Sequence, residues 1–193
     1  LACIAIQSNQ NDQHGGQSIP NFDYGMAHGV RKTYRKLYSR NLAKALELFV
    51  GLENADETTK EIREKVHAAH GLYPVLADDN GYRDFELPEL AGLAEESTLI
   101  RAQAFAVEEA YKETKRATYQ AMEALVHNLN TMHSRAGAQV PFSSLNYGTD
   151  TSPEGRMATE AILLATDAGL GHGETAIFPI HIFKVKEGVS FNP

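Results

Sequence analysis

The feature that most constrains this sequence is a stretch of roughly 39 residues, from Ser97 to Arg135, without proline or glycine. Alanines and charged residues mix there with apolar ones, as is typical of a helix. Unbroken, this helix would be about 60 Å long, and a helix of that length needs a packing partner. Gly137 is well placed to cap its C-terminus. A break is conceivable only near Lys112–Arg116, where the run is wholly polar.

Two more helices are predicted before this stretch. Apolar residues recur at helical spacing from about Met26 to Val50, and Gly51 follows as a stop signal. A shorter helix is expected to begin after Asp56 and to stop at Gly71. The first half of the chain is therefore mainly helical.

Three segments between these helices carry weaker signals. Residues 77–92 are rich in turn residues and residues 11–23 are polar, so both are predicted to be loops. The first ten residues are apolar enough for a helix end or a strand, and their periodicity does not decide between the two.

The C-terminal part is predicted to form a strand, a helix and a second strand. Residues 138–147 form a short strand pattern, with Pro141 marking an edge strand or an entry point. A helix follows over 151–171, with Pro153 at its first position. Residues 175–188 are almost continuously apolar, as in a strand buried on both faces. This order predicts a parallel pair of strands.

Together the patterns predict a helix-rich α/β fold. We expect 1–193 to be one section of a larger domain, with a mainly helical part, 1–136, and a strand-helix-strand part, 137–193. Leu1 opens inside an apolar run and Pro193 closes shortly after a strand-like segment, so we expect a fragment of a longer protein.

Composition excludes several classes of function. The net charge of -7 argues against a nucleic-acid surface, which needs clustered lysine and arginine. No apolar run approaches a membrane span, and no signal-peptide pattern opens the chain. Cys3 is the single cysteine, which excludes an internal disulfide or a Cys-rich zinc site and fits a cytoplasmic protein. No P-loop, dinucleotide fingerprint or Ser-His-Asp pattern occurs.

The first candidate site lies where the strand of 138–147 passes into the next helix. Free N–H groups at a helix start can bind an anion, and hydroxyl groups can extend such a site. Glycine there would let the backbone approach a ligand closely. The alternative is an ordinary capped helix after a loop. The candidate substrate-binding residues are Ser143, Ser144, Asn146, Gly148, Thr149, Thr151 and Ser152.

A second candidate is the stretch Asn9–Ser18, in which amide side chains flank two glycines. Amides both donate and accept hydrogen bonds, so they read sugar hydroxyls and base edges well. Gln17 and Ser18 are the candidate substrate contacts, and a simple turn is the alternative. His14 is a weak metal-ligand candidate, as are His67 and His70, because no third ligand is placed by sequence. We predict no metal site.

A third candidate lies on the long helix. Lys112, Lys115, Arg116 and Tyr119 fall on or near one side of it, where they could hold the phosphates and base of an effector nucleotide. A solvated face laced with salt bridges is the more common meaning of such a charged run.

Three longer motifs become specific when taken together. They are SNQNDQHGGQSIPNFDYGMA, NTMHSRAGAQVPFSSLNYGTDTSPEGR and GLGHGETAIFPIHIFKVKEGVSFNP. In this order and spacing they resemble the anaerobic, glycyl-radical (class III) ribonucleoside-triphosphate reductases. The resemblance covers nearly the whole chain and is weakest from about Leu46 to Glu96.

The resemblance implies a section of a ten-stranded α/β barrel with a finger loop inside. In the family, the thiyl cysteine on that loop would follow Pro193, and a second active-site cysteine would precede Leu1. The radical glycine and the four-cysteine structural zinc site lie near the family's C-terminus. Cys3 matches neither active-site cysteine, so no catalytic residue is expected in this chain and the fragment alone should be inactive.

The resemblance also implies the chemistry and partners of the intact enzyme. A radical activase with an iron–sulfur cluster and S-adenosylmethionine makes the glycyl radical. The thiyl radical then takes the ribose 3′ hydrogen, the 2′ hydroxyl leaves as water, and formate or a thiol system supplies electrons. The family is a cytoplasmic homodimer regulated by ATP and deoxynucleoside triphosphates. Two alternatives stay open: a non-catalytic effector-binding and dimerisation module, and a plain helical interaction domain.

Overall fold

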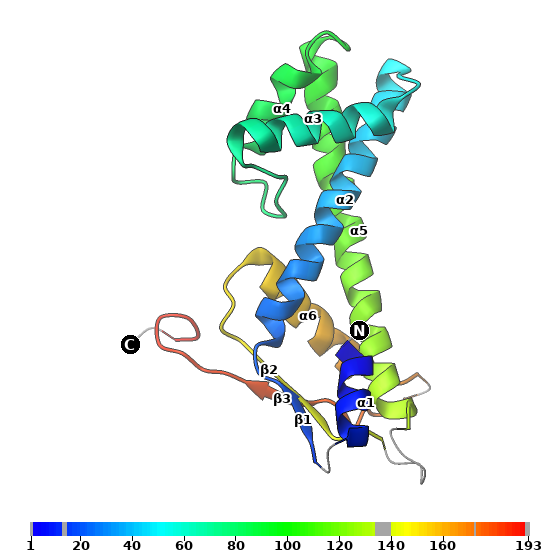
Figure 1. Ribbon diagram of the computed structural model, residues 1–193, viewed down its shortest axis with the longest axis vertical. Coiled ribbons are helices and arrows are strands. Elements are labelled where there is room, and N and C mark those ends of the chain that lie inside the picture. Colours follow the sequence, from blue (N-terminus) through cyan, green and yellow to red (C-terminus); the bar gives the residue numbers. More distant parts are fainter. Residues whose placement is uncertain (1, 13–14, 134–139, 172, 192–193) are drawn as a thin grey trace. The chain divides into compact units, whose positions relative to one another are not determined.

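The computed structural model describes residues 2–12, 15–133, 140–171 and 173–191. His14 and Gly137, both singled out in the sequence, lie outside these residues. The described elements, labelled in Figure 1, are α1 (Ala2–Asp12), β1 (Gln17–Ile19), α2 (Phe22–Val50), α3 (Ala55–His70), α4 (Tyr82–Leu90), α5 (Glu96–Thr131), β2 (Ser143–Tyr147), α6 (Pro153–Ala168) and β3 (Ile180–Phe183).

The chain divides into two compact units. Unit 1 comprises Leu1–Val30 and Arg116–Pro193, and unit 2 comprises Arg31–Lys115. Unit 1 contains all three strands, whereas unit 2 is helical. None of the helices in the described parts of the chain is long and apolar enough to cross a membrane.

Unit 1 is organised by a three-stranded sheet in the order β1-β2-β3, in which both neighbouring pairs are parallel (Figure 1). The predicted strand-helix-strand unit is confirmed as β2-α6-β3, and so is its parallel pairing. Because β2 is the central strand, Pro141 marks an entry point and the edge-strand alternative is wrong. Proline is tolerated there because it precedes the ladder.

One face of this sheet is left exposed by the described elements. The prediction of a strand over 175–188 buried on both faces is wrong, because β3 is limited to Ile180–Phe183 and most of its residues are exposed. Ile180 and Ile182 are 55% and 43% exposed. A continuous apolar run predicts a strand that is buried on both faces, but it does not identify the segment that covers those faces.

The N-terminal segment settles one open alternative and corrects one prediction. Residues 2–10 belong to a helix, α1, and not to a strand. The predicted loop over 11–23 contains β1 and the first turn of α2. Three residues are too few to show the alternation that identifies a strand, so β1 was not visible in the sequence.

Unit 2 contains a helix where a loop was predicted. Within residues 77–92, α4 spans Tyr82–Leu90 and buries Tyr82, Glu86 and Leu90, one on each successive turn. The turn residues stop just before it, at Gly81, and Pro88 falls in the last turn, where it interrupts little. Gly71 ends α3 in the left-handed conformation, as predicted, and its N–H bonds His67 O.

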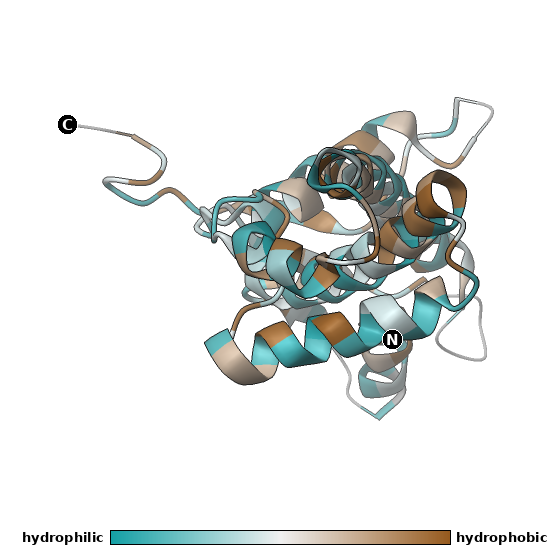
Figure 2. Ribbon diagram, turned by 90° about the horizontal axis from the view of Figure 1, so that it is seen from above, coloured by the Kyte–Doolittle hydropathy of each residue, from teal (hydrophilic) through white to brown (hydrophobic). Residues whose placement is uncertain are grey.

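Two long helices, α2 and α5, lie side by side and antiparallel within unit 2. Asn41 Nδ2 donates to Glu113 Oε2 at 2.7 Å, and the rings of Phe49 and Phe105 meet edge to face at 6.0 Å. The helix α5 runs without a break through Lys112–Arg116. Hydrophobic and hydrophilic residues alternate along the helices (Figure 2).

Candidate functional site

The exposed face of the sheet brings together three of the predicted polar residues. Ser18 pairs with Ser144 in the register of β1 and β2, and Asn146 lies two residues further along β2 on the same face. Ser18 Oγ donates to Asn146 Oδ1 at 3.1 Å. Ile180 and Ile182 of β3 continue this face. The result is a neutral surface of hydroxyl and amide groups beside apolar side chains, here called the polar sheet face.

The other predicted strand residues point to the opposite face. Gln17 pairs with Ser143, and Ser143 is buried together with Leu145 and Tyr147. The Ser143 hydroxyl has no hydrogen-bond partner among the described residues. Alternation along a strand therefore separates Ser143 and Gln17 from Ser18, Ser144 and Asn146.

The loop after β2 is held by a residue that the sequence analysis did not single out. The carboxylate Oδ2 of Asp23, in the first turn of α2, accepts the backbone N–H groups of Gly148, Thr149 and Asp150 at 2.9, 3.0 and 2.9 Å. Its other oxygen, Oδ1, accepts the N–H of Tyr24 at 3.0 Å. Three successive N–H groups of the loop before α6 thus already bind an anion of the protein.

These contacts determine the charge of Asp23. Burial raises the pKa of its carboxyl, but the N–H groups of Asp150, Gly148, Tyr24 and Thr149 lower it further, and the net pKa lies below the ordinary value of 3.8. The side chain is 1% exposed. Asp23 is therefore a buried carboxylate that stays ionised, with backbone N–H groups in place of a cation.

The start of α6 is capped from within the loop, as the alternative interpretation expected. Asp150 Oδ1 accepts the N–H of Ser152 at 2.8 Å, and Ser152 Oγ accepts the N–H of Gly155 at 3.1 Å. Ser152 is thereby identified as the cap and Pro153 as the first helical residue. Thr149 and Thr151 remain as the hydroxyl side chains that the loop can offer to a ligand.

No pattern in the sequence could have revealed Asp23. It lies 125 residues before Gly148 in the chain, and an aspartate in the first turn of a helix is explained by the helix dipole alone. Parallel pairing of β1 with β2 brings the segment after β1 beside the segment after β2. The partnership therefore follows from topology.

The predicted effector residues lie on one helix, α5. Lys112 Nζ bonds Glu108 Oε1 at 2.6 Å and Glu109 Oε1 at 3.0 Å, so part of its charge is already met on its own helix. Lys115, Arg116 and Tyr119 follow on the same side of α5 and are exposed or half-buried. Their role as an effector site remains a prediction.

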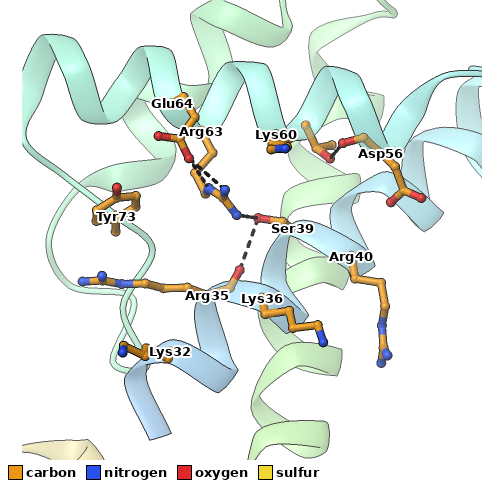
Figure 3. A pocket seen from close by; sticks show the side chains of 11 residues that line it. Lys32, Arg35, Lys36, Ser39, Arg40, Asp56, Lys60, Arg63, Glu64 and Tyr73 are labelled. Carbon is orange, nitrogen blue, oxygen red and sulfur yellow. Dashed lines mark hydrogen bonds and ion pairs between the residues drawn. The ribbon is translucent and has the colours of Figure 1, made fainter. Parts of the chain in front are cut away.

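Unit 2 holds a second candidate that the sequence analysis did not identify. A cavity of about 550 Å³ opens between α2 and α3 (Figure 3). Six of its lining residues are cationic and two are acidic, so the basic pocket, as we call it, has a net positive charge. Its lining is Lys32, Arg35, Lys36, Ser39, Arg40, Asp56, Thr59, Lys60, Arg63, Glu64 and Tyr73.

The contacts within the basic pocket fix some of these groups and leave others available. Arg63 bonds Glu64 at 2.8 Å and donates to Ser39 Oγ at 3.2 Å. Tyr73 is covered on its ring by the Arg35 guanidinium at 4.3 Å and is stacked with His67 at 3.9 Å. In the described part of the chain, Lys32 and Lys36 make no ion pair.

His67 and His70 each pack against an aromatic ring. His67 stacks on Tyr73, and His70 stacks on Phe85 at 4.1 Å. Among the described residues, no three His, Cys, Asp or Glu side chains are grouped so that they could hold a metal ion. The structural zinc implied by the resemblance therefore finds no ligand set in this part of the chain.

Comparison with known proteins identifies the family. The family model described as anaerobic ribonucleoside-triphosphate reductase matches residues 1–193. The chain is similar to the anaerobic ribonucleoside-triphosphate reductase of Escherichia coli (strain K12), with 36% identity over 98 residues, 50% of this chain and 13% of that relative. It is similar to the enzyme of that name from Enterobacteria phage T4, with 39% identity over 82 residues, 42% of this chain and 13% of the relative.

A third relative, from Salmonella typhimurium (strain LT2), is 36% identical over 78 residues, 40% of this chain and 11% of the relative. The matched segments thus span only about an eighth of the length of these relatives. The match of the family model, by contrast, covers the sheet, the polar sheet face and the basic pocket alike. The chain belongs to the anaerobic ribonucleoside-triphosphate reductase family.

Proposed function

We propose that this chain is part of the catalytic subunit of an enzyme that reduces ribonucleoside triphosphates to deoxyribonucleoside triphosphates by radical chemistry. The polar sheet face supports the proposal most directly. Ser18, Ser144 and Asn146 come from two of the three family motifs, and parallel pairing aligns them on one face. Neutral donors and acceptors of this kind suit the ribose hydroxyls of a nucleotide.

The exposed apolar residues beside these groups fit the same proposal. Ile180 and Ile182 face the side that no described element covers. In our proposal the three parallel strands are a section of the family's ten-stranded barrel, and this face looks into it. Apolar side chains there would exclude water from the bound nucleotide, while the hydroxyl and amide groups orient its ribose.

The residues of this chain would hold and orient the substrate, and the reacting groups would come from elsewhere in the enzyme. The glycyl radical, installed by a radical S-adenosylmethionine activase, supplies the radical chemistry when present. Cys3 is buried and its thiol contacts Met132 Sδ at 3.8 Å, and burial raises the pKa of that thiol. These surroundings suit a packing residue and not a reactive thiolate.

Kinetics of the full-length protein test the substrate role. Ser144→Ala combined with Asn146→Ala should raise the KM for the ribonucleotide at least tenfold and change kcat less, because two hydrogen bonds to the substrate would be lost. Ser97→Ala, an exposed serine of α5, is the matched control and should change neither constant. Unchanged KM in the double variant would refute the proposed contacts. Ser144→Ala with Thr151→Ala would then ask whether the loop contributes.

The basic pocket favours a second role, the binding of a nucleoside triphosphate effector by unit 2. Six cationic and two acidic side chains line the pocket, and one of the six, Arg40, is paired with Glu113 at 2.8 Å. The clustered lysine and arginine side chains that remain suit a chain of phosphates. Because Arg35 and His67 already cover the Tyr73 ring, the pocket would take the phosphates and leave base stacking to another residue. This second role corresponds to the alternative of an effector-binding and dimerisation module.

Two pairs of lysines distinguish the candidate effector sites. Lys32→Ala with Lys36→Ala should weaken the binding of ATP and deoxynucleoside triphosphates at least tenfold if the basic pocket is the site. Lys112→Ala with Lys115→Ala removes the same charge from the site on α5. Calorimetric titration with ATP and deoxynucleoside triphosphates, with light scattering to measure dimerisation, would assign the effector to one pair. Equal, small effects in both would exclude both.

A further inference from the structure

Asp23 makes a contact set that goes beyond helix capping. Its Oδ2 is shared by three successive backbone N–H groups, of Gly148, Thr149 and Asp150, between 2.9 and 3.0 Å. Three N–H groups that converge on one point form a concave anion site of the kind that holds phosphates in other proteins. Here the protein itself supplies the anion. We call this set of contacts the Asp23 clamp.

The loop has further restraints on both sides of the clamp. Tyr24 donates its hydroxyl to Thr149 O at 2.9 Å. Lys184, directly after β3, gives its N–H to Tyr147 O at 2.7 Å and its ammonium to Asn21 Oδ1 at 2.7 Å. Asn21 and Tyr24 flank the clamp residue itself, so the start of α2 grips the loop at several points.

Gly148 shows how closely the loop is fitted. Its φ is +116°, and a Cβ at this position would lie 2.8 Å from the Phe183 ring and 2.9 Å from Lys184 O. A side chain would therefore have to displace the backbone after β3, and the loop could no longer present its N–H groups to Asp23. The glycine at 148, its positive φ and the Asp23 carboxylate therefore all favour the same conformation of the loop.

The clamp determines which part of a ligand this loop can meet. To reach the N–H groups of residues 148–150, a phosphate would have to displace the buried carboxylate of Asp23. Both groups are negatively charged, so they would repel each other. The side chains of Thr149 and Thr151 and the adjoining polar sheet face are neutral. This arrangement suits the uncharged ribose and disfavours the triphosphate.

We propose that Asp23 is a positioning residue for substrate binding: its carboxylate occupies the anion site of the loop 148–152, so that the loop contacts the ribose of a ribonucleotide and not its phosphates. This inference rests on the function proposed above, and it concerns a residue outside the set named there. Asp23 acts through the loop and does not touch the substrate.

Removal and replacement of the carboxylate test the proposal in the full-length protein. Asp23→Ala should raise the KM for the ribonucleotide at least tenfold, and added acetate should reverse part of that rise by filling the vacated anion site. Inorganic tripolyphosphate should inhibit Asp23→Ala more strongly than the wild type, by about tenfold, because phosphates can then enter. Asp23→Asn keeps the shape of the side chain without its charge, so its KM and its inhibition by tripolyphosphate should lie between those of the wild type and Asp23→Ala.

Two controls keep the test decisive. Asp84→Asn changes an exposed aspartate in the first turn of α4 and should leave KM unaltered. Tyr24→Phe removes only the hydroxyl bond to Thr149 O from a half-exposed side chain, so it should fold even if the Asp23 variants do not. It should raise KM by about twofold to threefold, with kcat unchanged.

The outcomes separate this proposal from the function on which it rests. A wild-type protein that binds no ribonucleotide overturns the proposed function and, with it, the loop's role. A wild type that binds, together with Asp23 and Tyr24 variants of unchanged KM, overturns the clamp alone. A loss of active fraction at constant KM, with no response to acetate or tripolyphosphate, would show that Asp23 acts only on folding.

Discussion

Each unit contains a buried carboxylate whose pKa departs from its ordinary value, and the two depart in opposite directions. In unit 1, Asp23 accepts four backbone N–H groups and its pKa is lowered below 3.8. In unit 2, Glu86 accepts Tyr38 Oη at 2.5 Å and Gln103 Nε2 at 2.8 Å, yet burial dominates and raises its pKa above 4.5. Backbone N–H groups of a fixed loop hold a charge, whereas two side-chain donors do not outweigh desolvation.

This difference has a structural consequence. Asp23 ties together segments that are far apart in the chain, so its charge maintains the geometry beside the polar sheet face. Glu86 joins α4 to α2 and α5 within the core of unit 2, where Tyr82 also packs edge to face on Tyr38 at 5.8 Å. The carboxylate of Asp23 orders a loop, whereas that of Glu86 hydrogen-bonds side chains of two neighbouring helices.

Isosteric amides should reveal the difference with the largest effect. We expect Asp23→Asn to lower the free energy of unfolding by about 2 to 3 kcal/mol, because an amide is a weaker acceptor for three converging N–H groups. Glu86→Gln should cost about 1 kcal/mol or less, since its amide oxygen can accept the same two donors without a buried charge. Urea unfolding of the purified protein at neutral pH measures both. Equal losses would contradict the comparison.

The pH dependence of stability should separate the two carboxylates next. Because the folded pKa of Asp23 is lowered, its contribution is present above 3.8 and is lost as the pH falls through the folded pKa. Because that of Glu86 is raised, stability is favoured below 4.5 and lost as the pH rises through the folded pKa. Unfolding of the wild type and both amide variants from acid to neutral pH checks this. Each amide variant should remove only the pH dependence of stability that its own carboxylate contributes.

The fold was largely predictable where signals are local. Helical spacing, the glycine stops and the proline start of α6 located the main helices and the parallel β2-α6-β3 unit. The failures were short or ambiguous elements: β1 has three residues, and the turn residues before α4 concealed the helical burial of Tyr82, Glu86 and Leu90. Such elements form because tertiary packing supports them, and local sequence does not record that support.

The site was predictable only in part, for a related reason. Residue types indicated Ser18, Ser144 and Asn146, and the register of β1 and β2 then placed the three on one face. The role proposed for Asp23 depends on a segment 125 residues away, and the basic pocket depends on how α2 and α3 pack together. A single sequence shows which groups are available, and only the topology shows which of them meet.

Helix caps extend the comparison with a moderate effect. Ser152 caps α6 in unit 1 through the N–H of Gly155, whereas Asn54 of unit 2, before α3, makes no side-chain cap bond. Ser152→Ala should therefore lower the free energy of unfolding by about 1 kcal/mol, and Asn54→Ala should change it by a few tenths at most. Denaturant unfolding decides. A larger loss for Asn54 would mean that an alternative cap conformation prevails in solution.

Histidines provide the smallest and most specific contrast. In unit 2, His67 and His70 stack on aromatic rings. In unit 1, His181 lies between two hydroxyls, with Tyr147 Oη 3.0 Å from Nδ1 and Thr166 Oγ1 3.0 Å from Nε2. Thr166 already donates to Ile162 O at 2.8 Å, so it must accept from Nε2–H, and Nδ1 must accept from Tyr147.

This arrangement specifies the neutral Nε2–H tautomer of His181, and burial lowers the pKa of the imidazole below 6.5. The folded state then binds fewer protons than the unfolded state, so the full contribution of His181 is present above pH 6.5 and declines as the pH falls towards the folded pKa. Nitrogen NMR of the ring should show this tautomer and a midpoint below 6.5. His181→Gln should flatten the stability profile between about pH 5 and 7. A midpoint at or above 6.5 would contradict the lowering of the pKa by burial, and a proton on Nδ1 of the neutral ring would contradict the bond assigned to Tyr147.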